Sequence, residues 1–110
     1  MATSKESIAG RVRARKTISL GVASDGGGTQ VLLAAVAGES ILVEGIQIKN
    51  GAGGSCSVYH GTEGSTTTLS NASGMTPMDK IGVLCPLATA LNAHATTANA
   101  VVTVIYVMVQ

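Results

Sequence analysis

Two histidines and two cysteines are the residues of this sequence that most commonly bind metals: His60, His94, Cys56 and Cys85. Cys56 and His60 lie four residues apart, a spacing that aligns two ligands on a helix. In a strand the same spacing puts both side chains on one face, about 13 Å apart, which is too far to share an ion. Because the neighbouring residues alternate as in a strand, the sequence predicts a half-buried thiol, a surface imidazole and no cofactor.

Nucleophilic catalysis would require a Ser or Cys beside a base that a third group orients. Most carboxylates of this chain stand instead in turn-like contexts: Asp25, Glu39, Glu63 and Asp79. Glu44 is the exception, since it lies within a strand pattern, and a solvent-facing carboxylate is favoured there over a general acid. The sequence therefore predicts a protein that is not an enzyme.

Two glycine clusters, at 26–28 and 51–54, invite comparison with phosphate-binding loops. The first is followed by Thr29-Gln30-Val31, whereas a phosphate loop continues with Gly-Lys-Ser/Thr and opens a helix. The second cluster fails the same test. Both are typical of tight turns between strands, where glycine supplies positive φ.

Basic residues are concentrated at the start of the chain. Residues 1–16 carry five of them against one acid, a net charge of +4, and residues 17–110 carry a net charge of −3. The candidate partner-binding residues of this segment are Arg11, Arg13, Arg15 and Lys16. In an extended segment the three arginines, at every second position, would line one side and bind carboxylates or phosphates. A merely solubilising tail is the alternative.

Protein is favoured over nucleic acid as the partner of this basic segment. The chain contains no Phe or Trp and only two Tyr, so it lacks the interleaved aromatic side chains on which exposed bases stack. The rest of the chain is net negative. A basic arm that reaches onto an acidic surface of a neighbouring protein fits both observations.

The elements that must position these residues are strands. Apolar residues alternate with polar ones in short segments between glycine-rich turns, and no helical period is evident. The expected strands cover residues 17–22, 29–37, 41–48, 56–60, 66–68, 81–85, 91–97 and 101–109. Residues 29–37 are apolar on both faces and predict a doubly buried strand, and 66–68 suit an exposed edge.

Two of these strands carry sharper predictions. Ile41 and Val43 alternate on odd positions but Ile46 and Ile48 on even ones, so a β-bulge is expected at Gly45. The segment 101–109 is aliphatic at nearly every position, which predicts a central strand covered on both faces.

At 110 residues the chain accommodates one domain with one core. We expect an all-β fold, an eight-stranded jelly-roll-like β-sandwich over residues 17–110, with an extended basic N-terminal arm over residues 1–16. Strand count alone does not separate this from an immunoglobulin-like sandwich. Because the core lacks large aromatic rings, a thin sandwich, or one completed by neighbouring subunits, is expected.

The cysteines and the hydropathy pattern bear on the compartment. Cys56 and Cys85 do not resemble a disulfide framework, and two buried free thiols are favoured over one bridge. No stretch reaches the roughly 18 apolar residues of a membrane span, and the start of the chain lacks the apolar run of a signal peptide. Assembly in a cytoplasm, away from membranes, is the expectation.

From Thr29 to Gln110 the sequence resembles the small jelly-roll decoration proteins, also called cement or staple proteins, of tailed bacteriophage capsids. The matching features are the run from Val31 to Gly38 leading into Ser40-Ile41-Leu42-Val43, the closing run from Val101 to Val107, and the glycine-rich turns at 50–51 and 61. The resemblance is one of pattern and covers about three-quarters of the chain.

This resemblance implies a structural virion protein on the outer capsid surface that stabilises the shell by bridging major capsid proteins. It also implies that the arm inserts beside neighbouring subunits; a homodimer or homotrimer is expected. One alternative is a glycan- or receptor-binding module of a phage head fibre or tail, although sugar sites usually stack on Trp or Tyr. Another is a cupin-like metalloenzyme, which would need a histidine cluster.

Overall fold

The computed structural model describes residues 15–24, 29–64 and 66–110. Strands are the regular elements of these ranges, and there are eight of them. They are β1 (Lys16–Val22), β2 (Gln30–Leu33), β3 (Ser40–Asn50), β4 (Ser55–His60), β5 (Thr68–Ser73), β6 (Asp79–Leu84), β7 (Leu91–Thr96) and β8 (Ala100–Val109). The predicted all-β fold with eight strands is confirmed.

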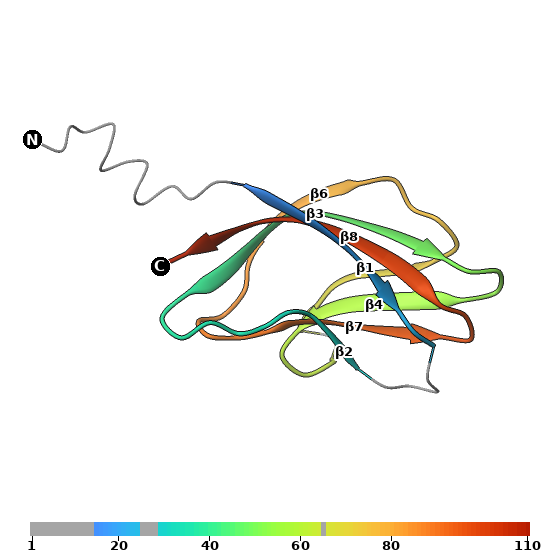
Figure 1. The fold of residues 1–110 in the computed structure, drawn as a ribbon, viewed down its shortest axis with the longest axis horizontal. Coiled ribbons are helices and arrows are strands. Elements are labelled where there is room, and N and C mark those ends of the chain that lie inside the picture. The colour runs from blue at the N-terminus through green and yellow to red at the C-terminus, as the bar shows by residue number, and fades with distance from the viewer. Residues whose placement is uncertain (1–14, 25–28, 65) are drawn as a thin grey trace, which may run out of the picture.

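The strands form two four-stranded antiparallel sheets that face each other (Figure 1). Sheet A has the order β1-β8-β3-β6, and sheet B has the order β2-β7-β4-β5. Neighbours within a sheet are mostly distant in sequence, so the chain crosses repeatedly between the layers. The prediction of a β-sandwich is therefore confirmed.

The core lies between the two inner faces. Sheet A contributes its long central strands, with Val43, Ile48 and Val104 inaccessible to solvent. Sheet B contributes smaller side chains, among them Ala93 and Ala95 of β7. Each buried aliphatic side chain stabilises the fold by roughly 1.5–3 kcal/mol. These small side chains and the aliphatic ones of sheet A make up a core without Phe or Trp.

The predicted β-bulge is present in β3. The pairing of β3 with β8 shifts register between Val43, which lies opposite Tyr106, and Gly45, which lies opposite Ile105. The pairing of β3 with β6 shifts at the same point. Glu44 is the extra residue, and the shift lets Ile46 and Ile48 face the core as Ile41 and Val43 do.

Residues 29–37 do not form the doubly buried strand that their apolar character predicts. The strand there, β2, covers only Gln30–Leu33, and Val31 is 58% exposed while Leu32 is buried. The reason is position: β2 is at an edge of sheet B, and only one of its faces meets sheet A.

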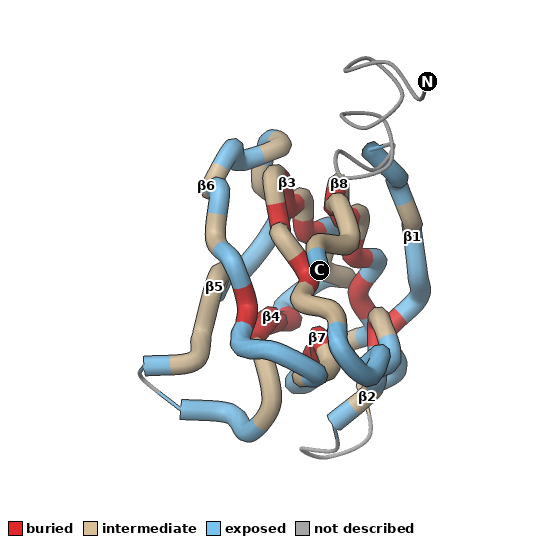
Figure 2. The backbone as a smooth tube through the Cα atoms, turned by 90° about the vertical axis from the view of Figure 1, so that its left-hand side faces the viewer, coloured by how far each residue is buried: buried red, intermediate tan, exposed pale blue. Residues whose placement is uncertain are grey.

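The strand at 101–109 is central, as predicted, but it is covered on one face only. β8 lies between β1 and β3, and its even-numbered residues from Ala100 to Tyr106 are buried. Its odd-numbered residues face outward, and Val101 is 42% exposed. No described element of the chain covers this outer face (Figure 2).

Two smaller predictions concern the edge strands. β5 is an edge strand, as expected for the Thr-rich segment, but it begins only at Thr68. In β1, Val22 is buried and Ile18 packs partly against the core, whereas Leu20 is 38% exposed although the alternation predicts burial. Leu20 has no neighbouring strand on its free side because β1 is the first strand of sheet A.

Candidate partner-binding surface

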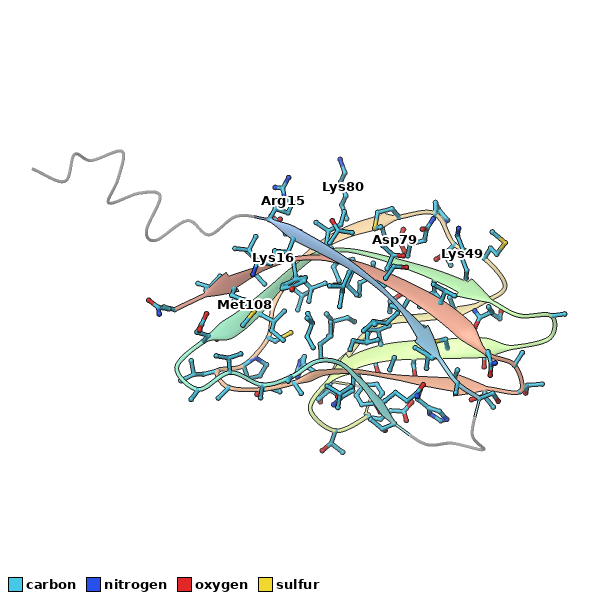
Figure 3. The ribbon with its side chains drawn as sticks, in the orientation of Figure 1. Arg15, Lys16, Lys49, Asp79, Lys80 and Met108 are labelled. Atoms are coloured by element: carbon cyan, nitrogen blue, oxygen red, sulfur yellow. The ribbon has the colours of Figure 1, made fainter. Side chains whose placement is uncertain are left out.

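The predicted arm residues fall into two groups. Arg11 and Arg13 lie outside the described residues, whereas Arg15 and Lys16 are described. Lys16 is the first residue of β1 and lies opposite Tyr106 of β8. Arg15 directly precedes the strand. Successive side chains of a strand alternate in direction, so Arg15 and Lys16 point to opposite sides of sheet A (Figure 3).

Arg15 is bound to a carboxylate of its own chain. Its Nε donates to Oε1 of Glu44 at 2.5 Å, and its Nη2 donates to Oε2 at 3.3 Å. These hydrogen bonds, together with the negative charge of Glu44, raise the pKa of Arg15 above its ordinary value. The first described residue of the basic segment is thus fixed against the outer face of sheet A.

The β-bulge creates the position of Glu44. With Glu44 inserted as an extra residue, it and Gly45 share the space opposite Ile105 on the outer face. Gly45 is closely approached by β6, because a Cβ there would lie 3.0 Å from Sδ of Met78 and 3.3 Å from the Asp79 carbonyl oxygen. At the bulge, an acidic side chain therefore lies next to the point where β6 closely approaches β3.

A shallow depression of about 390 Å³ lies at this bulge. Its lining includes three apolar residues, Met78, Ile81 and Ile105, and three charged ones, Arg15, Glu44 and Lys80. A depression with apolar and charged lining residues can accept an apolar side chain of a partner, flanked by a carboxylate that meets Lys80.

The outer face of sheet A continues as an aliphatic surface. Leu42 of β3 lies opposite Leu84 of β6 on one side and opposite Val107 of β8 on the other, so the three form a row across the sheet. Leu84 is 57% exposed. Further along β8, Val101 lies opposite Lys49. Aliphatic side chains therefore run beside lysines across this face.

Cationic side chains are confined to one layer of the described sandwich. The four described Lys and Arg residues belong to strands of sheet A or directly precede one: Arg15, Lys16, Lys49 and Lys80. The strands of sheet B contain no lysine or arginine. Figure 3 shows Arg15, Lys49 and Lys80 projecting from sheet A, away from sheet B.

Sheet B carries a polar cluster on its own outer face. Ser57 of β4 lies opposite His94 of β7, and Glu63 from the following loop folds back over both. Oε2 of Glu63 accepts a hydrogen bond from Ser57 Oγ at 2.9 Å, and its Oε1 lies 3.0 Å from Nδ1 of His94. The Ser57 hydroxyl and then His94 lower the pKa of Glu63.

Comparisons with known proteins do not assign this chain to a family. No family model, curated protein or solved structure matches this chain. The geometry of the two outer faces therefore carries the functional argument.

The cysteines and histidines do not meet at one site. Cys56 and Cys85 are free and buried, as predicted, and burial raises the pKa of both thiols, that of Cys56 to about 11. Cys56 is more deeply buried than predicted because it faces the core. Within the described ranges, no three His, Cys, Asp or Glu residues are grouped so as to hold a metal.

No helix in the described part of the chain is long and apolar enough to span a membrane.

Two of these contacts are not evident from the sequence. The pairing of Arg15 with Glu44 is one, although the arginine spacing and the change of alternation at Gly45 are both visible in the sequence. The contact of Glu63 with His94 is the other, because Glu63 has the neighbours of a turn residue. Both contacts join residues about 30 positions apart, 29 and 31 respectively.

Proposed function

We propose that this protein is a structural virion protein, a capsid decoration or cement protein of a bacteriophage. In this proposal it binds the outer surface of the capsid and stabilises the shell by bridging major capsid proteins. The observation that carries the proposal is the charge distribution. Every described Lys and Arg belongs to a strand of sheet A or directly precedes one, three of these four side chains point away from sheet B, and in the sequence the basic residues of 1–14 come before the first strand of that sheet.

The proposal includes a jelly-roll fold. A jelly roll contains eight strands in two sheets, built from two Greek keys. The orders β1-β8-β3-β6 and β2-β7-β4-β5 support it. Of each two consecutive strands (β1 and β2, β3 and β4, β5 and β6, β7 and β8), one belongs to each sheet. In such a fold the first strand lies at a sheet edge, so a segment that precedes it is free to reach a neighbouring protein.

The outer face of sheet A is the surface proposed to meet the shell. Its aliphatic rows, such as Leu84, Leu42 and Val107, would exclude water at the centre of the contact. Lys49 and Lys80 would meet carboxylates of the capsid protein, and Arg11 and Arg13 would extend this contact. Charges at the rim of such an interface mainly raise the association rate and make binding weaken with salt.

The bridging role is proposed on the basis of two separate contacts. A domain that contacts one capsid subunit through sheet A and another through its basic segment resists separation of the two. We propose that it acts as a homodimer or homotrimer, which would multiply the contacts per particle. Assembly onto the shell would take place in the host cytoplasm.

The test uses undecorated shells, one truncated variant and two substituted variants of the full chain. Removing residues 1–14 leaves Arg15 and β1 intact and tests the basic segment. Lys49→Glu with Lys80→Glu reverses the charge of sheet A. Asn71→Glu places a new charge at an exposed position of sheet B and is the control. We expect the first two to lower occupancy and shell melting temperature, and the control to match wild type. Wild-type occupancy in both the truncated variant and the Lys49→Glu, Lys80→Glu variant would contradict the proposal.

A glycan- or receptor-binding function would use the polar outer face of sheet B. The carboxylate of Glu63 and the hydroxyl of Ser57 are groups that bind sugar hydroxyls, but they are hydrogen-bonded to each other. Tyr59 also lies on this face, opposite Asn92, yet it is only 1% exposed, and its hydroxyl is hydrogen-bonded to Thr29. Its ring is not accessible to a sugar, so the decoration role is favoured. A glycan-array signal lost in Glu63→Gln would reverse this order.

A further inference from the structure

The sandwich has four edge strands, β1 and β6 in sheet A and β2 and β5 in sheet B. Three of them are short or irregular. β2 has only four residues, and its pairing with β7 contains a register shift. The pairing of β5 with β4 and that of β6 with β3 also contain register shifts. In addition, β6 contains Gly82 at φ +60°. Shortness, bulges and kinks are the features by which natural edge strands avoid pairing with other chains.

β1 has none of these features. Its seven residues pair with β8 without a register shift, from Lys16 opposite Tyr106 to Val22 opposite Ala100. It contains no proline, and its one charge, Lys16, stands at its start. Most of its residues are exposed, and in Figure 2 it forms the free margin of sheet A. No described strand pairs with its second row of backbone donors and acceptors, and this row is the one offered to another strand.

The side chains of β1 are self-complementary about Ser19. The residues on either side of it, Ile18 and Leu20, are aliphatic, and their side chains lie on the face of sheet A that is turned toward sheet B. Both remain partly exposed. The next residues outward, Thr17 and Gly21, are small and face away from sheet B. An antiparallel copy centred on Ser19 would thus place aliphatic against aliphatic and small against small.

We propose that β1 pairs antiparallel with β1 of a second copy of this chain, with Ser19 on the two-fold axis. Ile18 then lies opposite Leu20 of the partner subunit, twice by symmetry, and the two A sheets join into one continuous sheet. The inference rests on the self-association included in the proposed function, and its test needs no capsid.

Charge selects the antiparallel direction. In a parallel pair, Lys16 would stand beside Lys16 of the partner subunit, and the basic segments that precede them would run together. In the antiparallel pair, Lys16 lies opposite Val22 of the partner subunit, so the two lysines are roughly 20 Å apart. This separation exceeds the screening length of about 8 Å at physiological salt, so repulsion between them is weak. The two β1 strands then begin at opposite ends of the paired region.

Cysteine trapping tests the register. Residues directly opposite in antiparallel strands have Cα atoms about 4.5–5.5 Å apart, which suits a disulfide. Ser19→Cys should therefore form an intersubunit disulfide under mild oxidation. Thr17→Cys is the matched control, because Thr17 and its copy would be about 13 Å apart and should not cross-link. The native thiols, Cys56 and Cys85, are buried and should add little background.

Sedimentation of the full chain tests the edge itself. Leu20→Lys places a charge where the second strand would bury it, and we expect the dimer dissociation constant to rise about tenfold or more. Leu84→Lys makes the same change on β6, the other edge of sheet A, and should leave the dimer unchanged.

Three results would overturn the proposal. They are a monomeric or trimeric wild type, equal cross-linking of the Thr17→Cys and Ser19→Cys variants, and a dimer unaffected by Leu20→Lys. Shell binding is measured separately, so failure of the dimer would leave the decoration role standing.

Discussion

Arg15 and Glu44 are separated by 29 positions in the chain and joined by two hydrogen bonds between guanidinium and carboxylate. The pair spans β8, because Arg15 precedes β1 and Glu44 belongs to β3. It therefore links the residue before β1 to the bulge of β3, across β8. Glu44 is available for this contact because the bulge makes it an extra residue of β3.

A charge exchange tests this pair. Arg15→Glu and Glu44→Arg should each lower the melting temperature slightly, because each places like charges together, and the double variant should recover most of the loss. Arg15 is well exposed, so the effect should be small and should fade in high salt. Thermal unfolding at low and high salt measures it. Additive losses in the double variant would show that the two residues do not interact.

Truncation in the core should be costly, and the same truncation on the outer face should not. Ile48 is fully buried, so Ile48→Ala should lower the free energy of unfolding by about 2–5 kcal/mol. Leu84 is mostly exposed, and Leu84→Ala should change the free energy by less than about 0.5 kcal/mol. Urea unfolding of both variants is the measurement. Equal losses would contradict the placement of Leu84 on an open face.

The bulge leaves little space for a side chain at Gly45. Gly45→Val would press against Met78 and the Asp79 carbonyl, so we expect a loss of roughly 1–3 kcal/mol. Gly21 of β1 is the matched control, since a Cβ there meets nothing within 4 Å. Gly21→Val should therefore leave stability nearly unchanged. Urea midpoints that are the same for the two variants would argue against the close approach of β6 to the bulge.

The phase slip around Gly45 shows what a sequence pattern can predict. The change from odd to even alternation between Val43 and Ile46 has one simple explanation, a bulge, and the structure contains it. Alternation is a local property that each strand carries in its own residues. For the same reason the sequence predicts most strand positions correctly, including those of β4, β7 and β8.

Burial on the outer side of a strand is harder to predict because it depends on neighbours. Val31 and Val101 are aliphatic like the core residues beside them, yet both are exposed, because no other described layer of this chain covers them. The Glu63 to His94 contact depends on which strands are adjacent, and β4 and β7 become neighbours only through the sheet order. Local pattern does not specify that order.

Glu63 should make stability depend on pH in the acid range. Its pKa is lowered in the folded chain, first by the Ser57 hydroxyl and then by His94. The carboxylate therefore stabilises the fold above the unfolded pKa of about 4.3, and this contribution is lost as the pH falls through the lower folded pKa. An NMR titration of the Glu63 carboxyl carbon measures the shift.

Ser57→Ala is the matched variant for this titration. It removes the largest cause of the shift, so the pKa of Glu63 should move back toward its ordinary value. In Glu63→Gln, the acid-range loss of stability should be smaller than in wild type. A Glu63 titration that is the same with and without the Ser57 hydroxyl would show that this hydrogen bond does not form in solution.

The two thiols should be unreactive in the folded protein. Burial raises the pKa of both, to about 11 for Cys56, and the thiolate is the reactive form. A thiol-specific chromogenic reagent at about pH 8, near the ordinary thiol pKa, should therefore label neither cysteine quickly, and two thiols should react once denaturant is added. Rapid labelling before unfolding, or fewer than two thiols afterwards, would contradict two buried free cysteines.

The most direct test of the decoration role is an electron cryomicroscopy map of phage capsids assembled in the presence of this protein. We expect density for the sandwich on the outer surface of the shell, with the outer face of sheet A and the start of β1 turned toward the capsid protein. Density with sheet B against the shell would contradict the proposed surface. Particles that lack the protein altogether would contradict the proposed function.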